Sequence, residues 1–241
     1  MTVRFDHIAI AVRRIADAVP FLVGTLGGQP AYGAASRFFS FGHWRYRGGG
    51  RLEILEPNGE DGFLHRFLVQ HGPGVHHVTF QVPDLAATCA RAERHGHRVV
   101  GYDDSDPYWK EAFLHPKHAL GIVVQFAEMA RRSDGPAEPA WQPPPSPPSP
   151  PAPVTMLGLR MSAHSAASAD RQWGQLLGGT AAPAEDGAVV YRWPRSPLAV
   201  TVDIDPTADE GPTAIEFTST RQVDVPVGAE PVLGTIFARR E

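Results

Sequence analysis

The chain has 241 residues, of which 42% are hydrophobic and 20% charged, a composition typical of a soluble globular protein. A formal net charge of −4 and a pI near 6.2 argue against a nucleic-acid partner, which needs a basic face. The single cysteine, Cys89, cannot form an internal disulfide, and no stretch approaches the length of a membrane span. These features predict a cytoplasmic protein with no membrane partner.

The first predicted strand, residues 6–12, reads DHIAIAV and alternates a bulky face with a face of His7 and small residues. A helical stretch over residues 15–26 follows and ends at a glycine pair, the usual left-handed stop. Residues 51–57, RLEILEP, form a closing strand in which Glu53 interrupts an apolar run. The pattern predicts one βαβββ module.

An aromatic-rich segment lies between these elements, and residues 34–50 of it contain no carboxylate. We expect Phe38, Trp44 and Tyr46 to line a cleft and contact a flat or apolar part of a substrate. A buried core strand is the alternative interpretation. His43, in the same segment, is a candidate general base.

A second copy of the module follows. Residues 76–82, HHVTFQV, match the first strand, and the closing strand GIVVQFAE carries Gln125 at the position of Glu53. The offset is 70 residues between the first strands and 72 between the closing strands, which indicates duplication. His77 is therefore in register with His7. His76 lies on the other side of the pleat, where we expect it to be structural or to support a ligand.

Four polar side chains would meet if the two modules curled into a shared half-barrel. Each of them alone is more often a surface or hydrogen-bonded residue than a ligand. At matching positions in two copies, however, the ligand interpretation is favoured. The mixed nitrogen and oxygen donors suit Zn, Mn, Co, Ni or Fe(II). The predicted ligands are His7, Glu53, His77 and Gln125.

The motifs DHIAIAV, LEILEP, GVHHVTFQVPDL and FLHPKHALGIVVQFAE together resemble the vicinal oxygen chelate superfamily. The likeness is closest to methylmalonyl-CoA epimerase and glyoxalase-like proteins, and it covers roughly residues 4–130. It implies that the four predicted ligands hold a divalent ion, with the amide and the carboxylate exchanged relative to the epimerase. It further implies that the ion polarises a substrate carbonyl while a neighbouring base moves a proton.

The epimerase's catalytic glutamate has no counterpart within residues 34–50. In glyoxalase I, which the chain also resembles, a glutamate ligand serves as the base. We therefore expect Glu53 to be both ligand and base, with His43 as the other catalytic candidate. Lys117, in an HPK motif before the last strand, is expected to bind an anionic group of the substrate; a solvated lysine is the alternative.

Ten prolines between Pro136 and Pro153 predict a polyproline II linker over residues 133–153. The chain is thus divided into a paired metal-binding domain, residues 1–132, and a degenerate single module, residues 154–241. When the glycine pairs after the helices are aligned, Gly158 takes the place of His7. This module lacks the metal ligands, and we expect it to form a homodimer contact.

Taken together, these features predict an α+β fold and a metal-dependent lyase or isomerase that transfers a proton on a small oxygenated substrate. An extradiol-type dioxygenase is the second candidate, although such enzymes use two histidines and one carboxylate with open positions. A metal-free protein that sequesters a small molecule such as an antibiotic is the third. Metal content distinguishes this third candidate from the enzymes.

Overall fold

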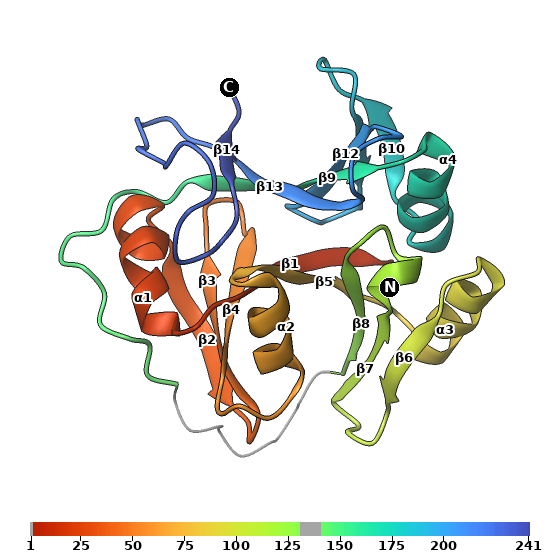
Figure 1. Ribbon diagram of the computed structural model, residues 1–241, viewed down its shortest axis with the longest axis horizontal. Coiled ribbons are helices and arrows are strands. Elements are labelled where there is room, and N and C mark those ends of the chain that lie inside the picture. The colour runs from red at the N-terminus through yellow and green to blue at the C-terminus, as the bar shows by residue number, and fades with distance from the viewer. Residues whose placement is uncertain (1, 131–140) are drawn as a thin grey trace. The chain divides into compact units, whose positions relative to one another are not determined.

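The computed structural model describes residues 2–130 and 141–241 (Figure 1). The described strands form two sheets, with the orders β2-β3-β4-β1-β5-β8-β7-β6 and β10-β11-β12-β9-β13-β14. The predicted α+β class is confirmed. Residues 133–140 of the predicted linker lie outside the described residues. The chain forms two compact units, one from residues 2–6, 77–130 and 158–213 and one from 7–76, 141–157 and 214–241.

The first module has the predicted order of elements. The helical stretch begins as an α-helix and continues as a π-helical turn from Pro20, which has no backbone N–H to donate. Strand β4 pairs parallel with β1 and antiparallel with β3. The elements are β1 (Arg4–Ala11), α1 (Ile15–Val19), η1 (Pro20–Thr25), β2 (Gln29–Ala35), β3 (Phe39–Arg45) and β4 (Arg51–Pro57).

A helix that the sequence did not predict, α2 (Phe63–His71), follows β4. Figure 1 shows α1 and α2 on either side of strands β2, β3 and β4. Helix α2 packs on the small-residue face of β1, and the buried residues of this contact are Ala9, Ala11, Leu55, Leu64 and Leu68. The part of this β1 face that carries Ala9 and Ala11 therefore belongs to the hydrophobic core. The part that carries His7 lies next to it on the same strand.

The second module repeats the topology of the first. Strand β8 pairs parallel with β5 and antiparallel with β7, and β6 pairs antiparallel with β7. The elements are β5 (Gly74–Gln81), α3 (Leu85–Arg94), β6 (Val99–Asp103), β7 (Trp109–Leu114), η2 (Pro116–His118) and β8 (Val123–Met129). The repeated pairing pattern is the structural counterpart of the repeated sequence.

The C-terminal region holds a third βαβββ arrangement and two further strands. Strand β12 pairs parallel with β9, as β4 does with β1, and β13 pairs parallel with β14, as β5 does with β8. The elements are β9 (Thr155–Ala163), α4 (Ala166–Ala169), η3 (Asp170–Leu176), β10 (Thr180–Pro183), β11 (Val189–Arg192), β12 (Ala199–Ile204), β13 (Gly211–Thr218) and β14 (Phe237–Arg239). The region thus contains more strands than one module needs.

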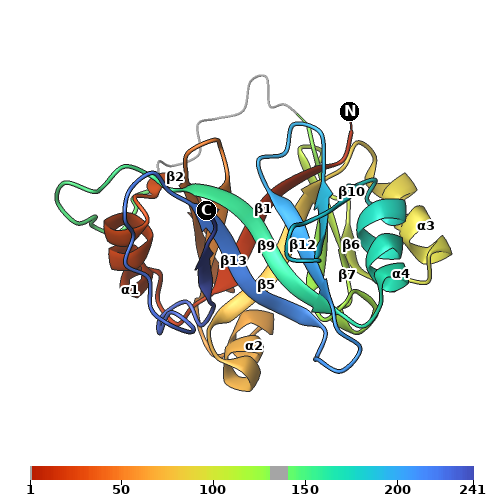
Figure 2. The same ribbon diagram turned by 90° about the horizontal axis from the view of Figure 1, so that it is seen from above.

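The described part of the proline-rich segment, residues 141–153, lies along the first module. Figures 1 and 2 both show it passing α1 in green. From Trp141 to Pro147 every third residue is half-buried and the others are exposed, the period of a polyproline II helix with one face docked. At its end the Val154 N–H donates to the Leu26 carbonyl at 3.0 Å.

Trp141 anchors this segment, which we call the strap. Its indole lies over Gly33 and Gly42, at positions where an added Cβ would overlap ring atoms, and it meets the Trp44 ring edge-to-face at 5.7 Å. The two glycines of β2 and β3 therefore leave room for the indole. The strap is packed against the protein along this length.

Candidate metal site

One half of the predicted site is assembled within the first module. His43 on β3 lies directly opposite Glu53 on β4, and Glu53 neighbours Ala9 on β1, two residues from His7. Because side chains alternate along a strand, all three polar groups lie on one face. The His7 Nε2 atom is 3.5 Å from Glu53 Oε2, and the His43 Nε2 atom is 3.2 Å from Glu53 Oε1. The carboxylate is thus held between two imidazoles.

The carboxylate of Glu53 stays ionised although it is buried. Burial by itself raises the pKa of a carboxyl group, because the charged form loses its hydration. Here the positive potential of His7 and hydrogen bonds from both histidines outweigh burial and hold the pKa of Glu53 well below its usual range. A buried, ionised carboxylate between nitrogen donors is a suitable ligand for a divalent cation.

His43 is held in a defined orientation by its neighbours. Its ring meets His7 edge-to-face at 4.8 Å and stacks on Tyr32 at 6.0 Å. Burial lowers the pKa of His43, although the hydrogen bond to Glu53 opposes this shift. Its Nδ1 atom is buried and has no hydrogen-bond partner among the described residues.

The other half of the predicted site lies in the second module. His77 and Thr79 are on β5, and Thr79 lies directly opposite Gln125 on β8. The Thr79 hydroxyl donates to Gln125 Oε1 at 2.6 Å, and Gln125 Nε2 donates to Glu111 on β7 at 2.8 Å. His77 and Gln125 are both buried. The amide of Gln125 is therefore fixed at both ends.

Three of the four predicted ligands form a group that could hold a metal ion. The donor atoms of His7, Glu53 and His77 all lie within 4.8 Å of one another, and all three residues are buried. Two imidazoles and one carboxylate are donors that Zn and similar divalent ions bind.

His76 faces a different environment from His77. Its ring contacts Phe67 at 4.9 Å and Phe63 at 5.4 Å, both on α2. Burial lowers the pKa of His76 to about 4, although the charge of Glu53 opposes the shift. The structure thus groups His77, and not its neighbour, with the candidate ligands.

The aromatic residues predicted to contact a substrate are divided between two faces of β3. Trp44 and Tyr46 are buried on the face opposite His43, where Trp44 packs against Trp141 and the Tyr46 hydroxyl lies 3.5 Å from the Leu22 carbonyl. Since side chains alternate along β3, this placement does not fit the cleft-lining role expected of these two residues. Phe39 and Phe41 share the face of His43 instead.

The two other predicted substrate contacts are exposed. Phe38 lies in the turn between β2 and β3, and its ring packs under Arg37 at 5.3 Å. Lys117 lies in the short η2 turn with an exposed side chain. The roles proposed for these two residues as substrate contacts therefore rest on the sequence alone.

Glu111 is a candidate functional residue that the sequence analysis missed. It is a carboxylate on β7 that accepts hydrogen bonds from Gln125 and from the Trp109 indole at 2.9 Å. Phe113 lies opposite Gln125, and Glu111 is two residues away on the same strand face. Recognising it from sequence requires the register of β7 against β8, which the motif alone does not give.

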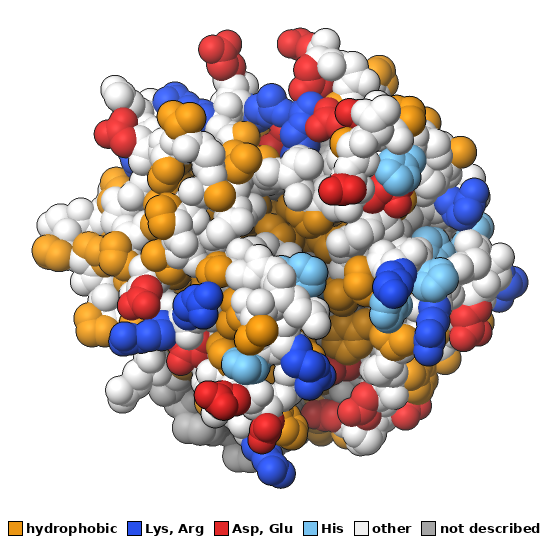
Figure 3. All heavy atoms as spheres, viewed as in Figure 1, with side chains coloured by type: hydrophobic (Ala, Val, Ile, Leu, Met, Phe, Trp, Pro, Cys, Tyr) orange, Lys and Arg blue, Asp and Glu red, His pale blue; other side chains and the backbone are white. Residues whose placement is uncertain are grey.

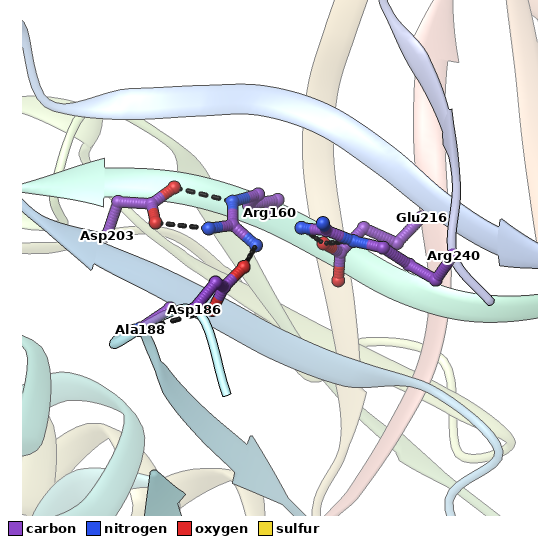
Figure 4. A network of polar contacts seen from close by, with 6 residues as sticks. All are labelled: Arg160, Asp186, Ala188, Asp203, Glu216 and Arg240. Carbon is purple, nitrogen blue, oxygen red and sulfur yellow. Dashed lines mark hydrogen bonds and ion pairs between the residues drawn. The ribbon is translucent and has the colours of Figure 1, made fainter. Parts of the chain in front are cut away.

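In the C-terminal region, charged pairs lie on the strand face that corresponds to the face of His7 and His77 in the first two modules. Figure 4 shows Arg160 on β9 pointing toward Asp203 and Asp186; Arg160 Nε donates to Asp203 at 2.6 Å and its Nη1 lies 2.9 Å from Asp186. On β13, the buried carboxylate of Glu216 accepts from Arg240 Nε at 2.7 Å. Each arginine is thus paired with a carboxylate of the same region.

The visible surface and the helices bear on possible partners. On the face drawn in Figure 3, acidic and basic side chains are interspersed among the described residues. Within the described ranges, every helix is too short or too polar to cross a lipid bilayer.

Part of the chain is similar to known proteins. Residues 6–113 match the family model of the Glyoxalase/Bleomycin resistance protein/Dioxygenase superfamily. An ethylmalonyl-CoA/methylmalonyl-CoA epimerase of Cereibacter sphaeroides is 29% identical over 137 residues, which cover 52% of this chain and 98% of that protein. The crystal structure of a hypothetical protein from Bacillus halodurans matches with a TM-score of 0.51 and 25% identity, over 56% of this chain and 100% of that one.

A fourth likeness extends over most of the chain. A mutant of 4-hydroxymandelate synthase from Streptomyces coelicolor matches with a TM-score of 0.62 over 90% of this chain and 71% of that one, at 13% identity. At that identity the likeness concerns the fold alone. The family match confirms, for residues 6–113, the resemblance to that superfamily that the sequence motifs indicated.

Proposed function

We propose that the protein is a divalent-metal-dependent enzyme of the vicinal oxygen chelate type that transfers a proton on a small oxygenated substrate. The observation that carries the proposal is the group formed by His7, Glu53 and His77, with donor atoms within 4.8 Å of one another. Gln125, on the same face of β5 and β8 as His77, is proposed as the fourth ligand. A lyase or isomerase reaction, as in the epimerases to which the chain is similar, fits this site best.

The donor set fits an ion such as Zn, Mn, Co, Ni or Fe(II). Two imidazoles, one ionised carboxylate and one amide oxygen provide borderline and hard donors with a single negative charge. When bound, such an ion would act as a Lewis acid toward substrate oxygens. The position of Glu53 between His7 and His43, within 3.5 Å of both rings, supports its role as a ligand.

We assign the proton transfer to His43. Its Nε2 atom lies 3.2 Å from Glu53 Oε1, which ties the imidazole to the carboxylate of the proposed site. This resembles the way in which a carboxylate fixes the tautomer of a catalytic histidine. Phe39 and Phe41, on the same strand face, are proposed to contact an apolar part of the substrate.

Metal analysis of the full chain purified without chelator tests the proposal. We expect about one divalent ion per chain, lost in His77→Ala and retained in His76→Ala. Equal loss in both variants, or a wild-type chain free of metal, would contradict the metal-dependent enzyme. A metal-free chain that retains a small molecule would support the sequestering alternative.

The remaining proposals concern the state of the protein in the cell. The C-terminal region is proposed to form a homodimer contact, and light scattering on the full chain should give about 52 kDa, twice the chain mass of 26.1 kDa. A monomeric mass would refute it. Buried, unpaired Cys89 is compatible with the proposed cytoplasmic location.

A further inference from the structure

The amide of Gln125 on β8 is held by side chains of the two strands on either side, β5 and β7, and we call this arrangement the clamp. Its Oε1 accepts a hydrogen bond from Thr79 on β5, and its Nε2 donates to Glu111 on β7. Glu111 is itself held by the Trp109 indole at 2.9 Å, on the same carboxylate oxygen. All four side chains belong to the second module.

The two partners of the Gln125 amide differ in whether they fix its orientation. A hydroxyl both donates and accepts, so Thr79 alone would tolerate either end of the amide. A carboxylate only accepts, so Glu111 requires the Gln125 nitrogen on its own side. The amide oxygen then lies on the Thr79 side, and its second lone pair remains available for a ligand.

We infer that Glu111 is a positioning residue that orients the Gln125 amide so that its oxygen, and not its nitrogen, is presented as a metal donor. This inference rests on the proposed function, because it assumes that Gln125 binds the ion. An amide nitrogen has no lone pair to offer a cation, so a flipped amide would remove one donor. Partners that orient metal ligands typically contribute 10–100-fold in metal affinity.

The same contact restricts which residue can occupy position 125. A glutamate there would bring a second carboxylate next to Glu111, and two carboxylates in contact repel. Glu111 thus favours an amide at position 125 and leaves Glu53 as the single carboxylate among the four proposed ligands. The charge of the site is set partly by a residue that does not bind the ion.

Titration of the full chain with Co²⁺ and Zn²⁺ tests the inference. Glu111→Leu removes the acceptor, and we expect metal affinity to fall about 10–100-fold, with a changed visible spectrum of the Co²⁺ form. The matched control is Lys110→Gln on the same strand, which breaks a 2.9 Å pair with Glu128 away from Gln125 and should leave affinity and spectrum unchanged. Wild-type affinity and an unchanged spectrum in a folded Glu111→Leu variant would overturn the inference.

A second pair of variants tests the contact without metal. Gln125→Glu should lower the Tm of the metal-free chain by about 5 °C through repulsion, and Glu111→Gln in the same chain should restore it. An equal Tm effect of Gln125→Glu in both backgrounds would overturn the inference, even if Glu111→Leu fails to fold. His77→Ala separates the proposed function from the inference about Glu111. If that variant retains the metal, both are refuted. If it loses the metal while the Glu111 variants bind metal as the wild type does, only the inference is refuted.

Discussion

The docking of the strap predicts an energetic coupling between Gly42 and Trp141. A Cβ added at Gly42 would lie 2.5 Å from Cζ2 of Trp141 and 2.8 Å from its Cη2 atom. Carbon atoms in contact are normally about 3.5–4.0 Å apart, so the indole must move by about 1 Å. Overpacking of this kind costs about 1–3 kcal/mol of unfolding free energy.

The coupling follows from a double-mutant cycle. Trp141→Ala should cost about 2 kcal/mol, less than the 3–5 kcal/mol of a fully buried aromatic residue, because Trp141 is half-exposed. In that background Gly42→Ala should cost about 1–2 kcal/mol less than in the wild type, with its 2.9 Å approach to Trp44 remaining. Urea unfolding of the four chains measures the cycle. Additivity within about 0.5 kcal/mol would refute the docked strap.

Further substitutions test individual contacts by the same unfolding assay. Gly158→Ala places a Cβ onto the Ala199 carbonyl oxygen at a φ of +146° and should lower the unfolding free energy by more than about 3 kcal/mol. Gly178→Ala, at a φ of +71° with open space around it, should lower it by only about 1 kcal/mol. Equal costs would contradict the close packing of β9 on β12. Arg240→Met removes the cation that faces buried Glu216 and should cost about 1.5–3 kcal/mol, and Arg239→Met, whose side chain bonds an exposed carbonyl, well under 1 kcal/mol. Burial lowers the pKa of His97 despite its hydrogen bond to the His118 carbonyl, so as the pH falls the unfolded chain binds a proton at His97 before the folded chain does. The stability that neutral His97 contributes is therefore fully present above about pH 6.5 and is lost as the pH falls through the lower folded pKa. A pH series from 7.5 to 5.5 should show a smaller decline in His97→Gln, and an unchanged decline would contradict this assignment.

The repeated modules could be predicted from sequence because their strands carry a strong period-two pattern at a nearly constant offset. The same pattern distinguishes His77 from His76, since alternation along a strand decides which ring shares a face with the ligand candidates. These conclusions needed only residues within a single strand and a comparison of two copies.

Features that depend on pairing between distant strands could not be predicted in the same way. Glu111 becomes a neighbour of Gln125 only through the register of β7 on β8. The aromatic run of β3 is divided between two faces, and composition alone does not separate Trp44 from Phe41. The strap has the composition of a free linker, and its docking depends on two glycines about a hundred residues earlier in the chain.

Gly158 has a consequence for how the third module can change. In the first module the equivalent position carries an imidazole, but here the backbone of β12 fills the space that any side chain would need. Any side chain at position 158, a histidine included, therefore requires a displacement of the neighbouring strand. As long as β9 and β12 keep this spacing, the position is closed to a metal ligand.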